Sequence, residues 1–410
     1  MRIKYNTFEH ELKEFLKSYL EISSFEQLQA RLDGKDLEQN PDEKRIKDFY
    51  RDQLNIDYNQ SNDRIQIDRV ITFAQKVLNT EKFSRFLIEL GHICISEGKY
   101  DIANDIFIKS NKLTNDNCTK AESFLGISEI FVRRAKWTRS MESIKKAQAL
   151  FKIESDALGI AKCENALGTI YGELGDINKA KKHFMTGLSL INRNEDVDFA
   201  ANLYTNLGIV YNIQGFHTDS LNHLNKALGL YKSLSKHKNI AEINLNIGIV
   251  NLDSDNYDNA LEALDTAVEI SKEYHFVSVL CLAYHVKSQV LIKMEDYSYA
   301  SEFANKALEM SHDFDDKLTV ADIYKVKGVI ERNLGNYILA ETNLLNSLRI
   351  NESMNNEINV AETSFELGLL YDKMDHSKLK NNYLTKSKEY YKNIDSPVKV
   401  ERIENILAFS

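Results

Sequence analysis

The chain has 410 residues, of which 43% are hydrophobic and 28% charged, a balance typical of folded proteins and far from that of disordered chains. Its formal net charge of −9 argues against a general nucleic-acid binder or a protein attracted to anionic membranes. No stretch approaches the roughly 18 apolar residues of a membrane span, and the N-terminus lacks an apolar signal-peptide segment. We therefore expect a cytoplasmic protein that is not inserted in a membrane.

The first segment of the chain, residues 1–80, predicts helices without a clear repeat. NTFEHELKEFLKSYL (6–20) has the apolar spacing of an amphipathic helix, and Asn6 is a suitable N-cap. A second helix is expected to start near Ser23 or Ser24 and to stop at Gly34. These two helices are expected to form an N-terminal cap.

Two further helices are expected before residue 80. One begins at Asn40–Pro41, where proline suits the first helical position, and RIQIDRVITFAQKVLNT (64–80) supplies the other. Together they could form a decayed copy of the repeat that follows. Proline occurs only twice in the chain, at Pro41 and Pro397, so little interrupts helix formation between them.

From residue 81 to residue 393 the chain repeats one pattern. Small residues recur 37 residues apart at the first step and 40 apart at every later step. They are Gly91, Ser128, Gly168, Gly208, Gly248, Ser288, Gly328 and Gly368. Two more columns of mostly small residues follow in register, beginning at Ala103 and Ser110. Three columns in register indicate a repeat architecture of stacked units.

Each unit divides into two amphipathic helices. Around Gly208, the residues Leu203, Leu207 and Tyr211 lie on one helical face, and a second apolar stripe starts at Leu221. Glycines recur between the stripes, at Gly98, Gly175, Gly215 and Gly335, where a helix end favours glycine. Because a hairpin cannot bury its own apolar stripe, neighbours must stack, and small residues let the paired helices approach closely.

The repeat resembles the tetratricopeptide repeat. The segments LGTIYGELGDINKA (167–180), LGHICISEGKYDIA (90–103) and KGVIERNLGNYILA (327–340) carry its pattern, although the usual proline is missing and the second unit lacks the glycines. The 40-residue period is similar to that of kinesin light chains and Rap-type bacterial regulators. The resemblance implies an all-α right-handed superhelical solenoid of about eight repeats over residues 81–393, with residues 1–80 as a helical cap and 394–410 as a C-terminal capping segment.

The resemblance also implies a binding face. In such repeats the first helix of each unit lines a concave groove, and asparagine side chains there can pair with the backbone of an extended peptide. An asparagine-rich chain could also place some asparagines there without any such role. The matching positions in this sequence are Asn165, Asn202, Asn206, Asn212 and Asn246. The known basic clamp for a terminal carboxylate is not matched, because Lys325 faces the groove but Glu366 stands where a cation would help.

Three other sets of residues have a plain structural explanation. HDFDD (312–316) contains a His-Asp pair, but an acidic loop between repeats is the expected interpretation, and no cofactor or metal is expected. The four cysteines are too dispersed for a disulfide framework and are expected to be free thiols. The last repeat is basic, which indicates a solvated face or, alternatively, a docking patch for an acidic partner. Its members are Lys373, Lys378, Lys380, Lys386, Lys388 and Lys392, with Tyr383, Tyr390 and Tyr391.

No catalytic motif appears in the sequence, so we expect a protein that is not an enzyme. The first hypothesis is a scaffold or regulator that binds a protein or an extended peptide. The second is a Rap-like peptide-pheromone receptor that changes conformation and controls an effector, and the third is the sensory module of a signalling complex. The identity of the partner and the oligomeric state are left open by the sequence.

Overall fold

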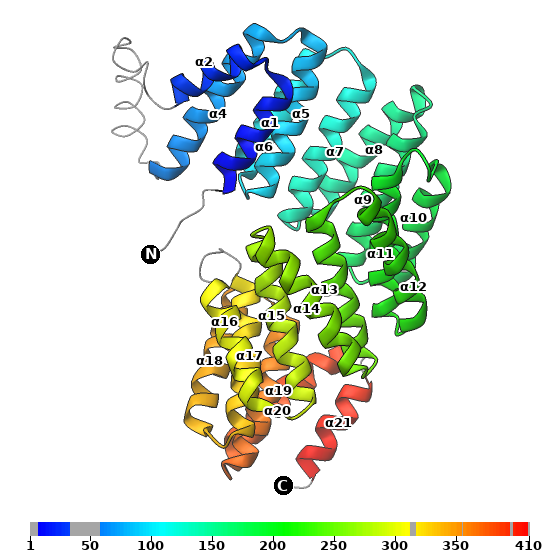
Figure 1. The fold of residues 1–410 in the computed structure, drawn as a ribbon. Coiled ribbons are helices and arrows are strands. Elements are labelled where there is room, and N and C mark those ends of the chain that lie inside the picture. The colour runs from blue at the N-terminus through cyan, green and yellow to red at the C-terminus, as the bar shows by residue number, and fades with distance from the viewer. Residues whose placement is uncertain (1–6, 33–57, 312–316, 355, 394–396, 409–410) are drawn as a thin grey trace. The chain divides into compact units, whose positions relative to one another are not determined.

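A computed structural model describes residues 7–32, 58–311, 317–354, 356–393 and 397–408 (Figure 1). Within these ranges the secondary structure is entirely helical. The first helices are α1 (Thr7–Tyr19), α2 (Ile22–Leu32) and α4 (Tyr58–Val77). None of the described helices is both long enough and apolar enough to cross a membrane.

The chain forms two compact units, residues 1–196 and residues 197–410. The first unit continues with three helical hairpins: α5 (Thr80–Ser96) with α6 (Tyr100–Leu113), α7 (Asn117–Arg133) with α8 (Trp137–Ile153), and α9 (Ala157–Glu173) with α10 (Ile177–Leu190). Within this unit each hairpin packs against the next through neighbouring helices.

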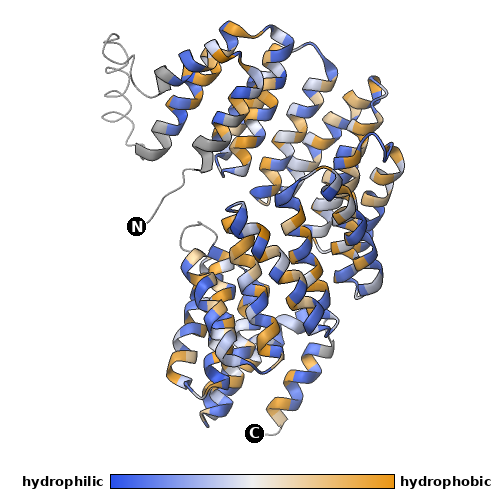
Figure 2. Cartoon of the chain, viewed as in Figure 1, coloured by the Kyte–Doolittle hydropathy of each residue, from blue (hydrophilic) through white to orange (hydrophobic). Residues whose placement is uncertain are grey.

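The second unit holds five hairpins and a final helix. They are α11 (Val197–Ile213) with α12 (His217–Ser233), α13 (His237–Asp253) with α14 (Tyr257–Glu273), α15 (Val277–Lys293) with α16 (Tyr297–Ser311), α17 (Lys317–Asn333) with α18 (Tyr337–Ser353), α19 (Glu357–Lys373) with α20 (Ser377–Asn393), and α21 (Pro397–Ala408). Apolar and polar segments alternate along these helices, as expected for amphipathic elements (Figure 2). The predicted all-α solenoid of eight hairpin repeats is confirmed.

The N-terminal helices are confirmed in part. Helix α1 covers most of the predicted 6–20, and α2 begins at Ile22, slightly before the predicted Ser23 or Ser24. The fourth predicted helix ends earlier than expected, at Val77, because Asn79 caps the next helix by accepting a hydrogen bond from the Lys82 backbone N–H at 2.9 Å. Asn6, Gly34 and the helix expected from Asn40–Pro41 lie outside the described residues. The division at residues 80 and 393 stays a prediction.

The glycines of the small-residue column mark a close contact between the two helices of their hairpins. A Cβ atom added to Gly208 would lie 2.7 Å from the Leu224 side chain and 3.3 Å from the Ser220 carbonyl oxygen of α12. The buried Ser220 hydroxyl donates to the Gly208 carbonyl at 2.7 Å, so the crossing is also hydrogen-bonded. The predicted close approach of the two helices is confirmed, with a leucine side chain seated directly on the glycine.

The turn inside each hairpin needs a left-handed residue. The four predicted turn glycines have φ between 71° and 82°. Four other hairpins place a non-glycine residue at the same position with φ from 52° to 60°: Ala135, Asp255, Glu295 and Asp375. The turn geometry is therefore common to all eight hairpins, although glycine marks it in only half of them.

The last helix, α21, packs on α20. Ile403 is 1% exposed and contacts the cluster of Ala361, Leu384 and Tyr391. The role of residues 394–410 as a C-terminal capping segment stays a prediction.

Candidate functional site

The second unit contains a cavity of about 520 Å³, which is formed mainly by the first helix of each of four successive hairpins. The wall comes from the C-terminal part of α13, from α15, α17 and α19, and from Tyr391 of α20, while α21 contributes one side. The lining residues are Leu252, Asp253, Asp255, Gln289, Ile292, Lys293, Lys325, Val326, Val329, Glu362, Phe365, Glu366, Tyr391, Lys399, Arg402 and Ile403. The volume lies within the range of about 300–1,000 Å³ that is usual for ligand pockets.

The lining residues of the first helices follow one register. Relative to the small residue of their repeat, they stand six, three or two positions before it, or one, four or five positions after it. This spacing forms a single stripe along a helix. We call this stripe the cavity face.

The five asparagines predicted for the groove all occupy cavity-face positions of their own repeats. Asn202 stands six before Gly208, and Asn206 and Asn246 stand two before Gly208 and Gly248. Asn212 stands four after Gly208, as Leu252 does after Gly248, and Asn165 stands three before Gly168. The register prediction is therefore consistent with the cavity face, but none of the five side chains lines the cavity itself.

The structure brings some of these asparagines together. The Asn206 side-chain N–H donates to Asn202 Oδ1 at 3.1 Å on α11. Asn212 Nδ2 donates to Asp253 Oδ2 at 2.6 Å, which joins α11 to the rim of the cavity. Asn165 lies in the other unit, on α9, and Asn246 lies partly buried on α13. Whether they bind a peptide stays a prediction.

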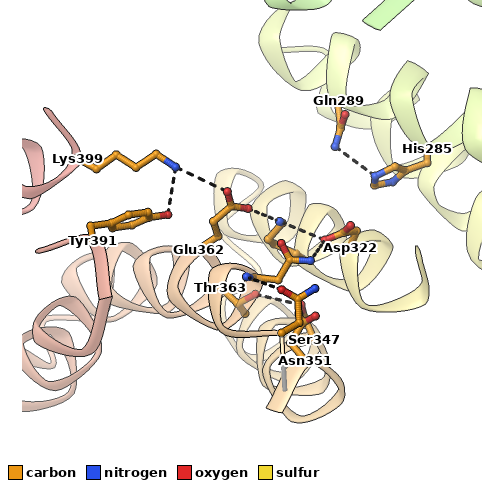
Figure 3. A network of polar contacts seen from close by, with 12 residues as sticks. His285, Gln289, Asp322, Ser347, Asn351, Glu362, Thr363, Tyr391 and Lys399 are labelled. Carbon is orange, nitrogen blue, oxygen red and sulfur yellow. Dashed lines mark hydrogen bonds and ion pairs between the residues drawn. The ribbon is translucent and has the colours of Figure 1, made fainter. Parts of the chain in front are cut away.

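A partly buried charge network includes two of the residues that line the cavity, Lys325 and Glu362, and joins them to Asp322 (Figure 3). Lys325 Nζ lies 2.8 Å from Glu362 Oε2 and 3.3 Å from Asp322 Oδ1. Burial lowers the pKa of Lys325, but the nearby carboxylates of Glu362 and Asp322 outweigh burial and raise the pKa overall. Lys325 is therefore a cation that is already paired with carboxylates of α17 and α19. It is not free to bind a terminal carboxylate by itself.

His285 lies beside this network on α15. Its imidazole Nε2 is 3.2 Å from the amide of Gln289, a lining residue, and its Nδ1 is buried without a hydrogen-bond partner among the described residues. Burial lowers the pKa of His285 to about 4. The imidazole is therefore neutral at neutral pH.

The final helix supplies two cations to the cavity. Lys399 Nζ lies 3.3 Å from the Tyr391 hydroxyl, 3.8 Å from Glu362 Oε1 and 4.5 Å from the centroid of the Tyr391 ring (Figure 3). The Arg402 guanidinium lies 5.0 Å from the centroid of the Phe365 ring. The sequence analysis missed both cations, because α21 lies outside the repeat and has no register from which to place them.

Two other sets of residues were singled out in the sequence: the basic residues of the last repeat and the HDFDD segment. In the basic set of the last repeat, Lys380 is 4% exposed and pairs with Asp372 at 2.8 Å, so it is not part of an exposed face, and Lys386 pairs with Glu352 at 2.7 Å. HDFDD (312–316) lies outside the described residues. Among the residues that the structure does describe, no group of three or more His, Cys, Asp or Glu side chains could hold a metal ion.

Comparison with known proteins identifies the repeats. Tetratricopeptide-repeat family models match residues 165–194 and 199–273. No curated protein matches the sequence. Among solved structures, a Rap protein complexed with competence and sporulation factor is 14% identical, with a TM-score of 0.57, and the match covers 80% of this chain and 97% of that chain.

Two further solved structures have similar folds. Aspartyl phosphate phosphatase F from Bacillus subtilis is 12% identical, with a TM-score of 0.55 and 95% coverage of both chains. NprR in complex with its cognate peptide NprX is 13% identical, with a TM-score of 0.54, and the match covers 79% of this chain and 99% of that chain. At these identities the likeness concerns the fold.

The hairpins, their small-residue contacts and the family matches define an all-α repeat solenoid. The chain contains tetratricopeptide repeats, which the family models match over residues 165–194 and 199–273.

Proposed function

We propose that the chain binds an extended peptide, or an extended segment of a partner protein, along the cavity face of the second unit. The observation that carries this proposal is the cavity itself, whose wall is built by four successive first helices in one register. Such a wall offers the same kinds of side chains at regular intervals, which suits a linear ligand better than a compact one.

The chemistry of the wall supports a peptide ligand. Apolar side chains such as Leu252, Ile292 and Phe365 alternate with hydrogen-bonding groups such as Gln289 and Lys399. A peptide presents the same mixture, since its backbone needs donors and acceptors while its side chains need apolar contacts. Binding without catalysis is proposed because the sequence carries no catalytic motif.

The asparagines extend this site toward α11. Asn246 and Asn206 occupy the register position that Val326 and Glu366 hold in the cavity. A chain longer than the cavity would therefore pass these two amides in succession. Asn206 already donates one hydrogen bond to Asn202, which fixes the orientation of its amide.

Selection from a random peptide library, followed by calorimetric titration, tests the proposal. We expect Val329→Trp, which fills the cavity, to abolish binding of selected peptides. Asn206→Ala and Asn246→Ala should each weaken binding about ten- to hundredfold, since losing a buried hydrogen-bond partner costs about 1–3 kcal/mol. Lys232→Ala, on the exposed side of α12, is the control.

The outcomes separate the parts of the proposal. Peptides that bind the Val329→Trp variant as well as the wild type would refute binding in the cavity. Normal binding to both asparagine variants would confine the ligand to the cavity and remove the asparagines from the site.

A peptide-sensing receptor is a second candidate. It is favoured by the fold shared with the Rap protein complexed with competence and sporulation factor and with NprR complexed with its cognate peptide NprX. A receptor requires that binding changes a part of the chain remote from the ligand. Hydrogen exchange of α1 to α10 should then change when a selected peptide binds, and unchanged exchange there would leave a simple binding scaffold.

A further inference from the structure

We propose that the cavity recognises an acidic side chain of the bound segment, which Arg402 and Lys293 receive, with apolar residues beside it. This inference rests on the peptide-binding function proposed above and assigns the chemistry of its ligand. The inference follows from a difference between the charged groups of the cavity wall: its carboxylates are already paired, whereas two of its cations are not.

The four carboxylates of the cavity wall already accept hydrogen bonds from other side chains of the protein. Glu362 accepts from Lys325 at 2.8 Å, and Glu366 accepts from Arg332 at 2.6 Å. Asp253 accepts from Asn212 at 2.6 Å, and Asp255 accepts from the Tyr257 hydroxyl at 2.7 Å. A cationic ligand would have to compete with these internal partners, so the carboxylates are poorly suited to receive one.

Arg402, in contrast to these carboxylates, lacks a charged partner among the described residues. The ion pairs among the described residues give it no carboxylate, and its guanidinium rests on the Phe365 ring. Contact with an aromatic face orients a guanidinium but leaves its N–H donors unused. Those donors match the two oxygens of a carboxylate, which is the strongest common form of charged hydrogen bonding. Arg402 is therefore oriented for an anion that the described chain does not supply.

Lys293 adds a second unpaired cation from another helix. It stands at the end of α15, lines the cavity, and takes part in no ion pair among the described residues. Lys399, one helical turn before Arg402, lies at 3.8 Å from Glu362 and keeps donors beyond its contact with Tyr391. The net charge of −9 does little to oppose an acidic ligand in the cavity, because salt screens exposed charges that lie more than about 8–10 Å away.

The apolar part of the wall defines the neighbours of the acidic group. Leu252 and Ile292 lie four residues after the small residue of their repeats, while Val326, Val329 and Ile403 complete the apolar surface. Burying an apolar side chain contributes affinity that is not sensitive to salt, whereas the charged contact selects the ligand.

An acidic side chain fits better than a terminal carboxylate. The cavity face continues in register along α13 and α11, past Asn246 and Asn206. A segment that follows this face runs through the cavity region instead of ending in it. We therefore assign the anion to a side chain within the segment.

Random peptides fused through their C-termini to a display protein test this assignment, because such peptides have no free terminal carboxylate. We expect peptides selected by the wild type to be enriched in Asp or Glu next to an apolar residue. In a synthetic peptide with an amidated C-terminus, changing that acid to its amide should weaken binding about ten- to hundredfold in fluorescence anisotropy. With Arg402→Gln, the same change in the peptide should have little effect, because the interaction is already lost.

A matched variant controls for charge. Arg349→Gln removes the same charge from the exposed surface of α18, where the Arg349 guanidinium donates to Asn346 Oδ1 at 3.4 Å, and should leave the selection unchanged. If the acid-to-amide change has no effect on a peptide that Val329→Trp excludes, the acidic-ligand inference is wrong while peptide binding stands. If Val329→Trp leaves binding of every selected peptide intact, both proposals fail.

Discussion

At the scale of single residues, each glycine of the small-residue column lies under one side chain from the second helix of its own hairpin. The side chain comes sixteen residues later in every case. These partners are Phe107, Phe184, Leu224, Leu264, Leu344 and Leu384. An added methyl group would stand 2.5 to 2.7 Å from the partner's atoms, which is closer than atoms pack, so the glycine is required by contact and not by backbone conformation.

Substitution of Gly208 and of Gly229 by alanine should therefore change the stability of the fold in opposite directions. Gly208→Ala should destabilise the fold by about 1–3 kcal/mol, since Leu224 and the Ser220 carbonyl must move. Gly229 lies in α12 with nothing within 4 Å of an added Cβ, so Gly229→Ala should stabilise the fold by up to about 1 kcal/mol through helix propensity. Chemical denaturation measures both. Equal effects would show that the helix crossing is misplaced.

At the scale of the elements, the hairpin and its left-handed turn are the unit that repeats. Gly215 and Asp255 occupy equivalent turns, with φ of 79° and 58°. A left-handed conformation costs a non-glycine residue roughly 1–2 kcal/mol, which the packed hairpin on either side must offset. The turn is therefore imposed by helix packing, and glycine lowers its cost without determining its shape.

The period of 40 residues predicts which deletions are tolerated. Removing residues 208–247 joins Leu207 to Gly248, which restores a first helix in register, so a shorter solenoid should still fold. Removing residues 208–227 joins a first helix to the middle of a second helix and should unfold the neighbouring hairpins. Circular dichroism and thermal melting compare the two variants. A cooperative melt for the shorter deletion alone would contradict the repeat register.

At the scale of the whole chain, the cysteines report on the packing of both units. Cys94 and Cys163 of the first unit and Cys281 of the second are buried, while Cys118 is partly exposed. Burial raises the pKa of Cys94 and of Cys163 to about 12. Burial, followed by the charges of Asp116 and Asp156, also raises the pKa of Cys118. Thiolate, the reactive form, is therefore scarce at neutral pH.

A thiol-specific colorimetric reagent should label one cysteine in the native protein and all four in denaturant. The native reaction should speed up as pH rises, because the raised pKa of Cys118 keeps its thiol protonated at neutral pH. Cys118→Ser should abolish the native signal. Rapid labelling of further thiols in this variant would mean that one of the units opens readily.

The repeat, its small-residue contacts and the hairpins were predictable from the sequence because they depend on local patterning. Gly208 and Leu224 lie within one hairpin, and the period itself carries the register from one hairpin to the next. The same register placed Asn206 and Asn246 on the cavity face before any tertiary contact was known. Periodic contacts of this kind involve neighbours in sequence, so one sequence suffices to find them.

The cavity depended on contacts that no period describes. Arg402 and Lys399 come from a helix outside the repeat, and their places follow only from the packing of Ile403 on α20 and α19. The pairing of Lys325 with Glu362 depends on the separation of two helices in adjacent hairpins, so only the tertiary structure shows which charges of the cavity wall are paired. The sequence alone thus determined the solenoid and the register of the cavity face, whereas the tertiary structure decided the charge balance of the cavity, because only packing brings α21 against α19 and α20.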